Sequence, residues 1–264
     1  MTTTNEPVLY SRKGVMAHIR LNRPKVLNAL DQSMAQAFLA VCKTIQSADD
    51  IRVVVLSGEG RSFMAGGDLA KFHTDPTQAG QTAQQLIDPL HEALAILATL
   101  RQPVLASVHG PVAGAGVSLM LACDLAIAAD DATFNLAYAR IGASADGSVS
   151  WTLPRIVGLR KAMEIALLSD DIDAAEALRL GMINRMVKRD ALTAATEQLA
   201  QRLAQGPTFA YGQMKRLLRN SWNRSLQEQM DAECDAFCAC TGTSDFREGI
   251  DAFITRRPVK FDGS

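Results

Sequence analysis

The sequence predicts an α/β fold in the first part of the chain and a helical region at its end. Short apolar runs rich in β-branched residues alternate with helical patterns between about residues 8 and 129, and this alternation is typical of α/β folds. From about residue 148 onward the patterns are almost entirely helical. The 264 residues contain no linker rich in Pro, Gly or Ser, so one principal domain is expected.

The first elements predicted are a hairpin, a helix and a buried strand. Residues 8–22 contain two extended runs that are interrupted at residues 12–14, a pattern that indicates a β-hairpin. Residues 51–58, IRVVVLSG, form a compact β-branched run typical of a buried strand. Between them, apolar side chains recur at helical spacing: Met34, Phe38, Val41, Cys42 and Ile45.

The alternation continues with a helix at about 80–100, a strand at 103–108, a short helix after Gly116 and a strand at 124–129. Residues 102–123 also imitate a membrane span, because 22 residues pass without a formal charge. Proline and glycine interrupt this stretch repeatedly. A buried strand, a glycine-rich turn and a helix of small residues explain it better than a bilayer crossing.

The end of the chain is predicted to form a series of amphipathic helices. Only residues 182–187, MINRMV, look extended there. The helices are too few for a sizeable core of their own, so we expect them to cover the first part of the chain or a neighbouring subunit. The helical patterns occupy residues 157–169, 172–181, 192–204, 208–222 and 225–240.

Charge and targeting patterns exclude several classes of protein. The chain has 27 Lys and Arg against 28 Asp and Glu, with no run of five like charges, so neither a nucleic-acid surface nor a membrane surface is indicated. The N-terminal residues carry Glu6 and no basic residue before Arg12, which argues against a signal or transit peptide. The C-terminal DGS is no peroxisomal signal. A cytoplasmic location is expected.

The five cysteines fit reduced thiols in the cytosol better than a disulfide framework, because their number is odd and the chain is long. Three of them cluster in CDAFCAC at residues 234–240. That cluster has no neighbouring histidine and lies in a helical pattern, so no metal site is predicted.

Two glycine-bearing turns, each after a strand, are candidates for a functional site. They are FMAGGDLAKF at 63–72 and HGPVAGAGVSL at 109–119. A dinucleotide fingerprint would need a third glycine where Leu119 stands, and no lysine completes a phosphate loop. The alternatives are two ordinary turns or an oxyanion hole, in which each turn offers one backbone N–H to a substrate carbonyl.

Ordered motifs along nearly the whole chain carry a resemblance to a known family. They are FxAGxD at 63–68, HGxxxGAG at 109–116 and CDLAIA at 123–128, followed by a helix-rich end with DFREGIDAFITRR at 245–257. In this combination the chain resembles the crotonase, or enoyl-CoA hydratase/isomerase, superfamily. The resemblance implies a crotonase-like spiral of ββα units over 1–195 and a C-terminal helical trimerisation region over 196–264.

The resemblance also implies an acyl-CoA thioester as substrate, with no metal or redox cofactor, since coenzyme A belongs to the substrate. It places the two oxyanion-hole N–H groups on Gly67 and Ala115. Lys25 is then expected to contact a phosphate or to be a solvated loop lysine. Three further residues would lie along the CoA adenine and pantetheine: Ala65, Asp68 and Leu69.

The chain departs from the family where a hydratase holds its water between two glutamates. Those positions are Ser118 and Tyr138 here, and neither is a carboxylate base at neutral pH. Asp146, in the small-residue run GASADGSVS, stands where some isomerases of the family carry an acid. The strings PxxxNAL, AGGD, GAGVS and ADGSVSW look most like the branch that contains the ring-epoxide and oxepin isomerase of phenylacetate breakdown and related enoyl-CoA isomerases.

One carboxylate suffices for a 1,3-proton shift, so an enoyl-CoA isomerase with Asp146 as acid and base is the leading hypothesis. The residues alone favour Asp146 as an N-cap of the following helix, and it is the family resemblance that favours the catalytic role. An enoyl-CoA hydratase remains an alternative, and so does a dehalogenase or thioesterase-like enzyme with a nucleophilic aspartate and His91 as its partner. A non-catalytic acyl-CoA binder is a further alternative.

The acyl group itself is not readable from the sequence. Tyr138, Trp151 and Met64 are expected to shape its pocket or to belong to the core. The resemblance implies a homotrimer or a hexamer, without choosing between them.

Overall fold

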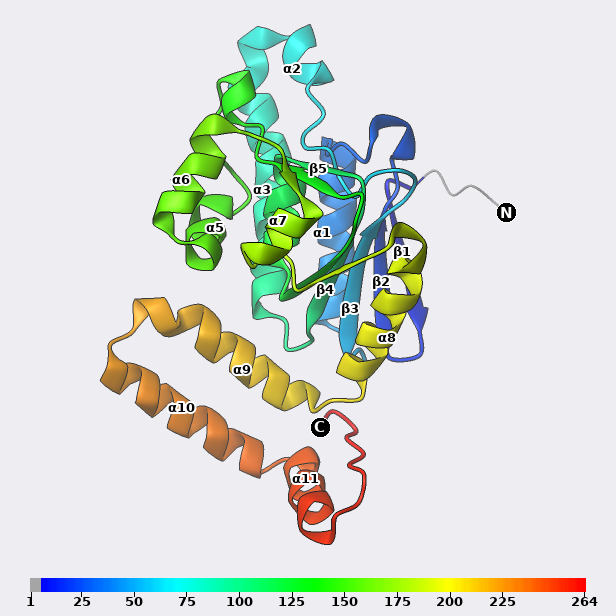
Figure 1. The fold of residues 1–264 in the computed structure, drawn as a ribbon, viewed down its shortest axis with the longest axis vertical. Helices are drawn as coiled ribbons and strands as arrows, with labels where there is room; N and C mark the ends of the chain where they lie inside the picture. Colours follow the sequence, from blue (N-terminus) through cyan, green and yellow to red (C-terminus); the bar gives the residue numbers. More distant parts are fainter. Residues whose placement is uncertain (1–5) are drawn as a thin grey trace.

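The computed structural model describes residues 6–264 (Figure 1). Residues 1–5, part of the segment considered above for a targeting signal, lie outside this range. The centre is a six-stranded sheet in the order β1 (Val8–Lys13), β2 (Met16–Leu21), β3 (Val53–Gly58), β4 (Val104–Val108), β6 (Leu125–Ala129) and β9 (Arg185–Val187). A second, three-stranded sheet contains β5 (Pro111–Ala113), β7 (Thr133–Asn135) and β8 (Ile172–Asp173).

The predicted hairpin and the alternation of strands and helices are confirmed. β1 and β2 pair antiparallel, and every following neighbour in the large sheet is parallel. Helices lie between the successive parallel strands, in chain order α1 (Gln32–Gln46), α2 (Ala70–Thr74), α3 (Ala79–Thr99), α4 (Ala115–Ala122), α5 (Val149–Val157), α6 (Leu159–Leu168) and α7 (Ala174–Arg179), and α8 (Leu192–Ala204) follows the last strand. This is a mixed α/β crotonase-type architecture.

Helices cover both faces of the large sheet (Figure 1). On one face, α1 packs against α3; its N-cap Asp31 accepts a hydrogen bond from the Met34 N–H at 2.8 Å, and its apolar stripe includes the buried Phe38. On the other face, α8 packs against β2, β3, β4 and β6. The first four residues of β3 are buried because both of its faces are covered.

The second sheet was not anticipated. Its strands have two or three residues each, too few for a period of two to be visible in the sequence. The expectation that only 182–187 is extended after residue 148 is therefore wrong at one point. Residues 172 and 173 form β8, and Asp173 then caps α7 by accepting a hydrogen bond from the Glu176 N–H at 2.7 Å.

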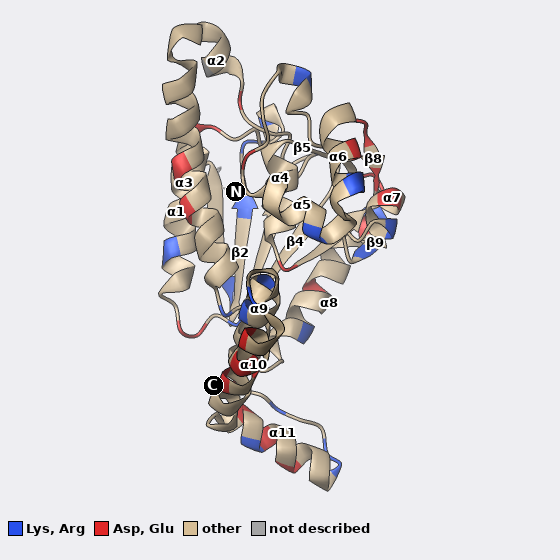
Figure 2. Ribbon diagram, turned by 90° about the vertical axis from the view of Figure 1, so that its left-hand side faces the viewer, with Lys and Arg blue, Asp and Glu red and all other residues tan. Residues whose placement is uncertain are grey.

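The uncharged stretch 102–123 folds as predicted, with β4 and α4 separated by a glycine-containing turn and the short β5. All eight residues of α4 are buried, which explains why it is apolar on every side. Figure 2 shows α4 and β4 without charged residues, whereas α10 carries acidic residues and α11 carries both acidic and basic ones. Among the described residues, no helix is both long and apolar enough to cross a membrane.

The chain leaves the sheet after α8 and continues as α9 (Thr208–Asn220), α10 (Leu226–Thr241) and α11 (Ser244–Thr255), which extend away from the core (Figure 1). The expected boundary at 195/196 lies inside α8, which packs on the sheet with residues from both sides of that boundary. As a division into two units it stays a prediction.

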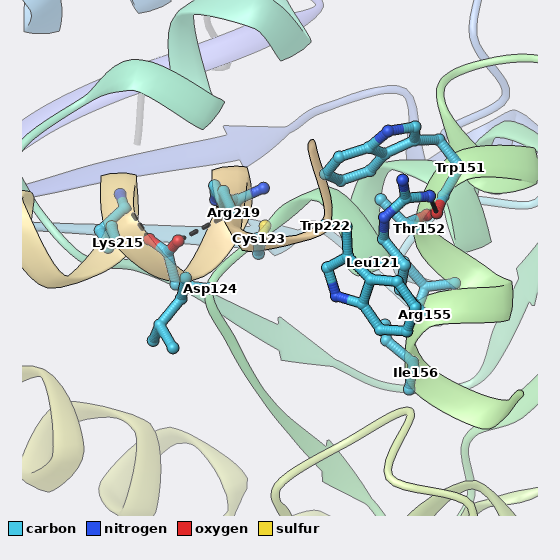
Figure 3. Close-up of a pocket in the computed structure, with 11 residues that line it drawn as sticks. Leu121, Cys123, Asp124, Trp151, Thr152, Arg155, Ile156, Lys215, Arg219 and Trp222 are labelled. Atoms are coloured by element: carbon cyan, nitrogen blue, oxygen red, sulfur yellow. Dashed lines mark hydrogen bonds and ion pairs between the residues drawn. The ribbon is translucent and has the colours of Figure 1, made fainter. Parts of the chain in front are cut away.

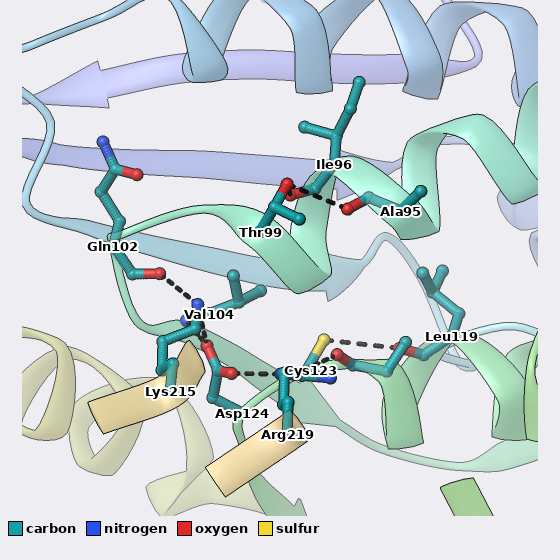
Figure 4. A network of polar contacts seen from close by, with 11 residues as sticks. Ala95, Ile96, Thr99, Gln102, Val104, Leu119, Cys123, Asp124, Lys215 and Arg219 are labelled. Carbon is teal, nitrogen blue, oxygen red and sulfur yellow. Dashed lines mark hydrogen bonds and ion pairs between the residues drawn. The ribbon is translucent and has the colours of Figure 1, made fainter. Parts of the chain in front are cut away.

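Helix α9 is joined to the core by a partly buried ion cluster (Figure 4). The Asp124 carboxylate, just before β6, lies 2.6 Å from the Lys215 ammonium and 2.9 Å from the Arg219 guanidinium. The same carboxylate accepts a hydrogen bond from the Val104 N–H at 2.8 Å. Burial lowers the pKa of Lys215 from its ordinary value, against the opposing effect of Asp124. The cluster fixes where α9 departs from the sheet.

Candidate active site

The two glycine-bearing turns lie against each other. Met64 and Val112 form an isolated parallel bridge, in which the Ala113 N–H donates to the Met64 carbonyl at 2.9 Å. Gly66 and Gly114 have φ angles of +97° and +48°, and a Cβ on Gly114 would lie 3.6 Å from the Gly66 Cα. Glycine is favoured at both positions by the positive φ angles, and a Cβ on Gly66 would also lie only 3.3 Å from the Ala113 carbonyl oxygen.

Each turn leaves one backbone N–H without a partner. Leu30 bridges to the first turn through the Gly66 carbonyl and the Asp68 N–H, both at 2.8 Å, so the Gly67 N–H points away from that bridge. Ala115 is the first residue of α4, where an N–H has no intrahelical acceptor. Within residues 6–264, neither N–H donates to a protein acceptor. Both are available to a ligand oxygen.

A cavity of about 740 Å³ opens beside these two residues. Its walls come from residues 65–69, from α2 and the start of α3, from the first residue of α4, and from residues 136–146. The lining is mainly apolar, and Asp146 is the single carboxylic acid among the described residues that line it. Gly67, Ala115 and Asp146, which the sequence singled out separately, therefore share one cavity.

The structure argues against Asp146 as a helix cap. The N-cap of α5 is Ser148, in a left-handed conformation with φ of +68°, and no side chain caps the helix. The Asp146 Oδ1 instead accepts a hydrogen bond from the Tyr138 hydroxyl. Its side chain is thus directed at the cavity wall and not at the N-terminus of α5.

Ser118 and Tyr138, which occupy the positions where a hydratase of the resembled family would carry its glutamates, both contact Asp146. The Ser118 Oγ lies 3.1 Å from the Tyr138 hydroxyl and 3.0 Å from the Asp146 carbonyl oxygen. Ser118 is completely buried on α4 and does not line the cavity. A Cβ on Gly147 would lie 2.8 Å from the Ser118 Cβ, so the space beside Ser118 is already filled.

His91 reaches the same loop from α3. Its Nε2 accepts a hydrogen bond from the Gly147 N–H at 3.2 Å, one residue after the candidate acid. The sequence raised two interpretations for His91, packing on a helix or partnership with the aspartate. The structure places His91 in contact with Gly147, the residue that follows Asp146. This position is relevant to the choice between isomerisation and dehalogenation.

The remaining predicted site residues separate into two groups. Ala65 and Leu69 line the large cavity, as does Tyr138. Asp68 does not; its carboxylate lies 3.0 Å from the Arg23 guanidinium and faces a smaller adjacent cavity of about 230 Å³. Lys25 is exposed in the short 3₁₀ helix Pro24–Val26, outside both linings. Its contact with a phosphate stays a prediction.

Neither Met64 nor Trp151 lines the large cavity, so for Met64 the alternative of a core residue holds. Met64 is 1% exposed in the core. Trp151 lies on α5 and faces a separate cavity of about 290 Å³ beside the C-terminal half of α9 (Figure 3). Trp222 and Arg155 line the same cavity, and the Arg155 guanidinium lies over the Trp151 ring. Asp124, the acid that lines this cavity, is paired with Lys215 and Arg219 and is not free to act as a general base.

The contribution of α3 to the site was missed in the sequence. Ala83, Leu86 and Ile87 line the cavity, one and two turns before the first buried residue of that helix, Leu90. Their spacing continues the apolar stripe that packs on the core. The apolar stripe of α3 thus extends beyond the residues that pack in the core, and this extra length is the sequence signal that could have indicated a helix face lining a ligand cavity.

Comparison with known proteins agrees with this architecture. The family model described as enoyl-CoA hydratase/isomerase matches residues 11–264. The chain is 38% identical to 1,2-epoxyphenylacetyl-CoA isomerase of Escherichia coli over 95% of this chain and 96% of that one. It is 34% identical to 4-chlorobenzoyl coenzyme A dehalogenase-2 of Arthrobacter, over 91% and 88%. A solved putative enoyl-CoA hydratase/isomerase of Mycobacterium abscessus superposes with a TM-score of 0.92 at 32% identity, covering 97% of this chain and all of the other.

Proposed function

The chain belongs to the enoyl-CoA hydratase/isomerase family and processes acyl-CoA thioesters, and we propose that its reaction is a double-bond isomerisation. One observation carries the proposal: Asp146 is the only carboxylate among the described residues lining the cavity onto which Gly67 and Ala115 open. A 1,3-proton shift needs one group that both accepts and returns a proton. The similarity to an isomerase at 38% identity supports the same reaction class.

The chemistry proceeds in two proton transfers. The thioester carbonyl oxygen accepts hydrogen bonds from the Gly67 and Ala115 N–H groups, which acidifies the carbon next to it. Asp146 removes a proton at the alpha or gamma carbon, and the negative charge passes to the oxygen as a dienolate. The two N–H donors stabilise this charge most when it has developed. The same carboxyl group then returns the proton to the other carbon, so no proton is gained or lost.

Water addition by paired carboxylates has little support at this site. Its two positions hold Ser118 and Tyr138, and the first is buried behind the cavity wall. Burial raises the pKa of Tyr138, and the charge of Asp146 together with the hydrogen bond to it acts in the same direction. The phenol therefore stays protonated at neutral pH and cannot replace a carboxylate base.

The test is the Asp146→Asn variant. An amide keeps the shape of the side chain but cannot accept the proton, so isomerisation should fall by a factor on the order of 100 or more. A panel of 2-enoyl, 3-enoyl and aryl-CoA thioesters, followed by ultraviolet absorbance and mass, identifies the substrate. In deuterated water the wild type should exchange alpha or gamma hydrogens and the variant should not.

Asp88→Asn is a matched control for this test, because Asp88 is on α3 and does not line the cavity. It should behave as wild type. If Asp146→Asn isomerises as fast as the wild type, Asp146 is not the base and the proposed mechanism is wrong.

Hydrolytic dehalogenation is a second candidate, favoured by the contact of His91 with Gly147. In this reaction Asp146 would attack the ring carbon of a halogenated aryl-CoA and expel halide. His91 would then help water hydrolyse the ester that forms. The similarity to a dehalogenase at 34% identity motivates the test. Continuous halide release from 4-chlorobenzoyl-CoA by the wild type that stops after about one equivalent per site in His91→Gln would support it, whereas isomerisation unaffected by His91→Gln would support the first candidate.

We also propose that the protein is a homotrimer, alone or paired as a hexamer. The C-terminal helices expose large apolar side chains far from the core, among them Leu226 at 76% and Phe253 at 84% of their accessible area. Helix α6 exposes Leu167 and Leu168 as well. Apolar surface on this scale is typical of a subunit interface.

A further inference from the structure

Three side chains from separate parts of the sequence form a hydrogen-bonded network at the cavity wall. Ser118 comes from α4, Tyr138 immediately precedes the 3₁₀ helix Ala139–Ile141, and Asp146 lies in the loop before α5. The Tyr138 hydroxyl donates to the Asp146 Oδ1 and lies 3.1 Å from the Ser118 Oγ. Tyr138 gives its only hydrogen to the carboxylate, so the one hydrogen of the Ser118 hydroxyl is shared between the tyrosine oxygen at 3.1 Å and the Asp146 carbonyl oxygen at 3.0 Å.

The two oxygens of the Asp146 carboxylate therefore differ. Oδ1 is held by Tyr138, whereas Oδ2 has no hydrogen-bond partner among residues 6–264. Asp146 lines the cavity, so the free oxygen is the one available to a substrate carbon. A carboxylate fixed at one oxygen cannot exchange its two oxygens by rotation about the Cβ–Cγ bond.

The backbone around Tyr138 is held in an unusual conformation. Ala137 has a φ of +56°, which is unfavourable for a residue with a Cβ. Its N–H donates to the Asn135 Oδ1 at 2.7 Å, and the Asn135 amide in turn donates to the Ser169 carbonyl at 2.7 Å. Asn135 is buried, so the backbone just before Tyr138 is held by hydrogen bonds that are shielded from water.

We infer that Tyr138 is a positioning residue, which holds the Asp146 carboxylate with one oxygen turned toward the reacting carbons. This inference rests on the proposed role of Asp146 as acid and base. It assigns to Tyr138 a role through Asp146, in addition to the place in the cavity lining expected from the sequence. Burial keeps the tyrosine protonated, so it acts as a fixed donor and takes no part in proton transfer.

Tyr138→Phe removes the donor and keeps the ring. Charge-assisted hydrogen bonds contribute about 1.5 to 3 kcal/mol, which corresponds to a kcat lower by roughly 10- to 100-fold. KM should change by no more than about twofold, because the phenyl ring still lines the cavity. Tyr10→Phe is the matched control: Tyr10 lies on β1, away from the cavity, and its substitution should leave kcat unchanged.

The decisive measurement is the double variant Tyr138→Phe/Asp146→Asn. If Tyr138 acts through Asp146, the phenylalanine should cause no further loss once the carboxylate is gone, so the two effects are not additive. Ser118→Ala gives a second measurement should Tyr138→Phe fold poorly. It removes the hydroxyl that contacts both the tyrosine oxygen and the Asp146 carbonyl oxygen, and it should lower kcat severalfold with KM unchanged.

Three results would overturn the inference: a Tyr138→Phe variant with a normal kcat, a variant that changes only KM, or a double variant in which both losses multiply. None of these touches the proposed function. Conversely, an Asp146→Asn variant with the wild-type rate would reject the proposed function itself, whatever Tyr138→Phe does.

Discussion

Gly116→Ala tests whether the contact between the two turns sets the geometry of the oxyanion hole. Gly116 is buried in the first turn of α4, next to Ala115. A Cβ at this position would lie 2.2 Å from the Met64 carbonyl oxygen, and 3.0 Å from its carbonyl carbon. That oxygen belongs to the backbone and is already fixed by the Ala113 N–H at 2.9 Å, so it cannot turn aside.

The size of the effect follows from this distance. Ordinary contact between a methyl carbon and an oxygen needs about 3.4 Å, so α4 and the turn after Met64 would have to separate by roughly 1 Å. The Gly67 N–H lies on that turn, and the Ala115 N–H lies on α4. A misplacement of about 1 Å costs on the order of 100-fold in rate, and overpacking of this kind costs about 1 to 3 kcal/mol of stability.

The assay is the initial rate of isomerisation on the substrate identified by the thioester panel, together with the thermal unfolding midpoint. We expect a folded variant whose kcat/KM is about 100-fold lower. Gly80→Ala is the control, because Gly80 lies in α3 and a methyl group on it would meet no other atom within 4 Å. Alanine there should leave the rate unchanged and stabilise the helix by up to about 1 kcal/mol. A Gly116→Ala variant with full activity would refute the assignment of the two turns to one oxyanion hole.

Two further predictions concern the C-terminal region. Asp124→Ala leaves Lys215 and Arg219 partly buried without their carboxylate, so the free energy of unfolding should fall by about 3 kcal/mol or more, as measured by urea denaturation; a loss below about 0.5 kcal/mol would show that the cluster is not stabilising. Light scattering at micromolar concentration should give the mass of a trimer or of a hexamer, because the apolar surface of α9–α11 is exposed in the single chain; a monomeric mass would contradict the proposed assembly.

The sequence determined most of the fold. Helical spacing in 30–50 and the β-branched run 51–58 predicted α1 and β3, because a long or fully buried element repeats its pattern often enough to be recognised. The same holds for the amphipathic helices at the end of the chain. The two- and three-residue strands β5, β7 and β8 could not be predicted, since their pairing depends on neighbours distant in the chain.

The glycine-rich turns indicated a possible oxyanion hole, and the family resemblance assigned it to Gly67 and Ala115 and, with no glutamate at 118 or 138, selected Asp146 as the acid. The sequence could not decide whether Asp146 caps a helix, because a capping aspartate and a cavity aspartate look alike in a loop of small residues. The tertiary structure decided this by bringing Tyr138 to Oδ1 and His91 to the next residue. These contacts join segments 8 and 56 residues apart, and only the folded chain sets such distances.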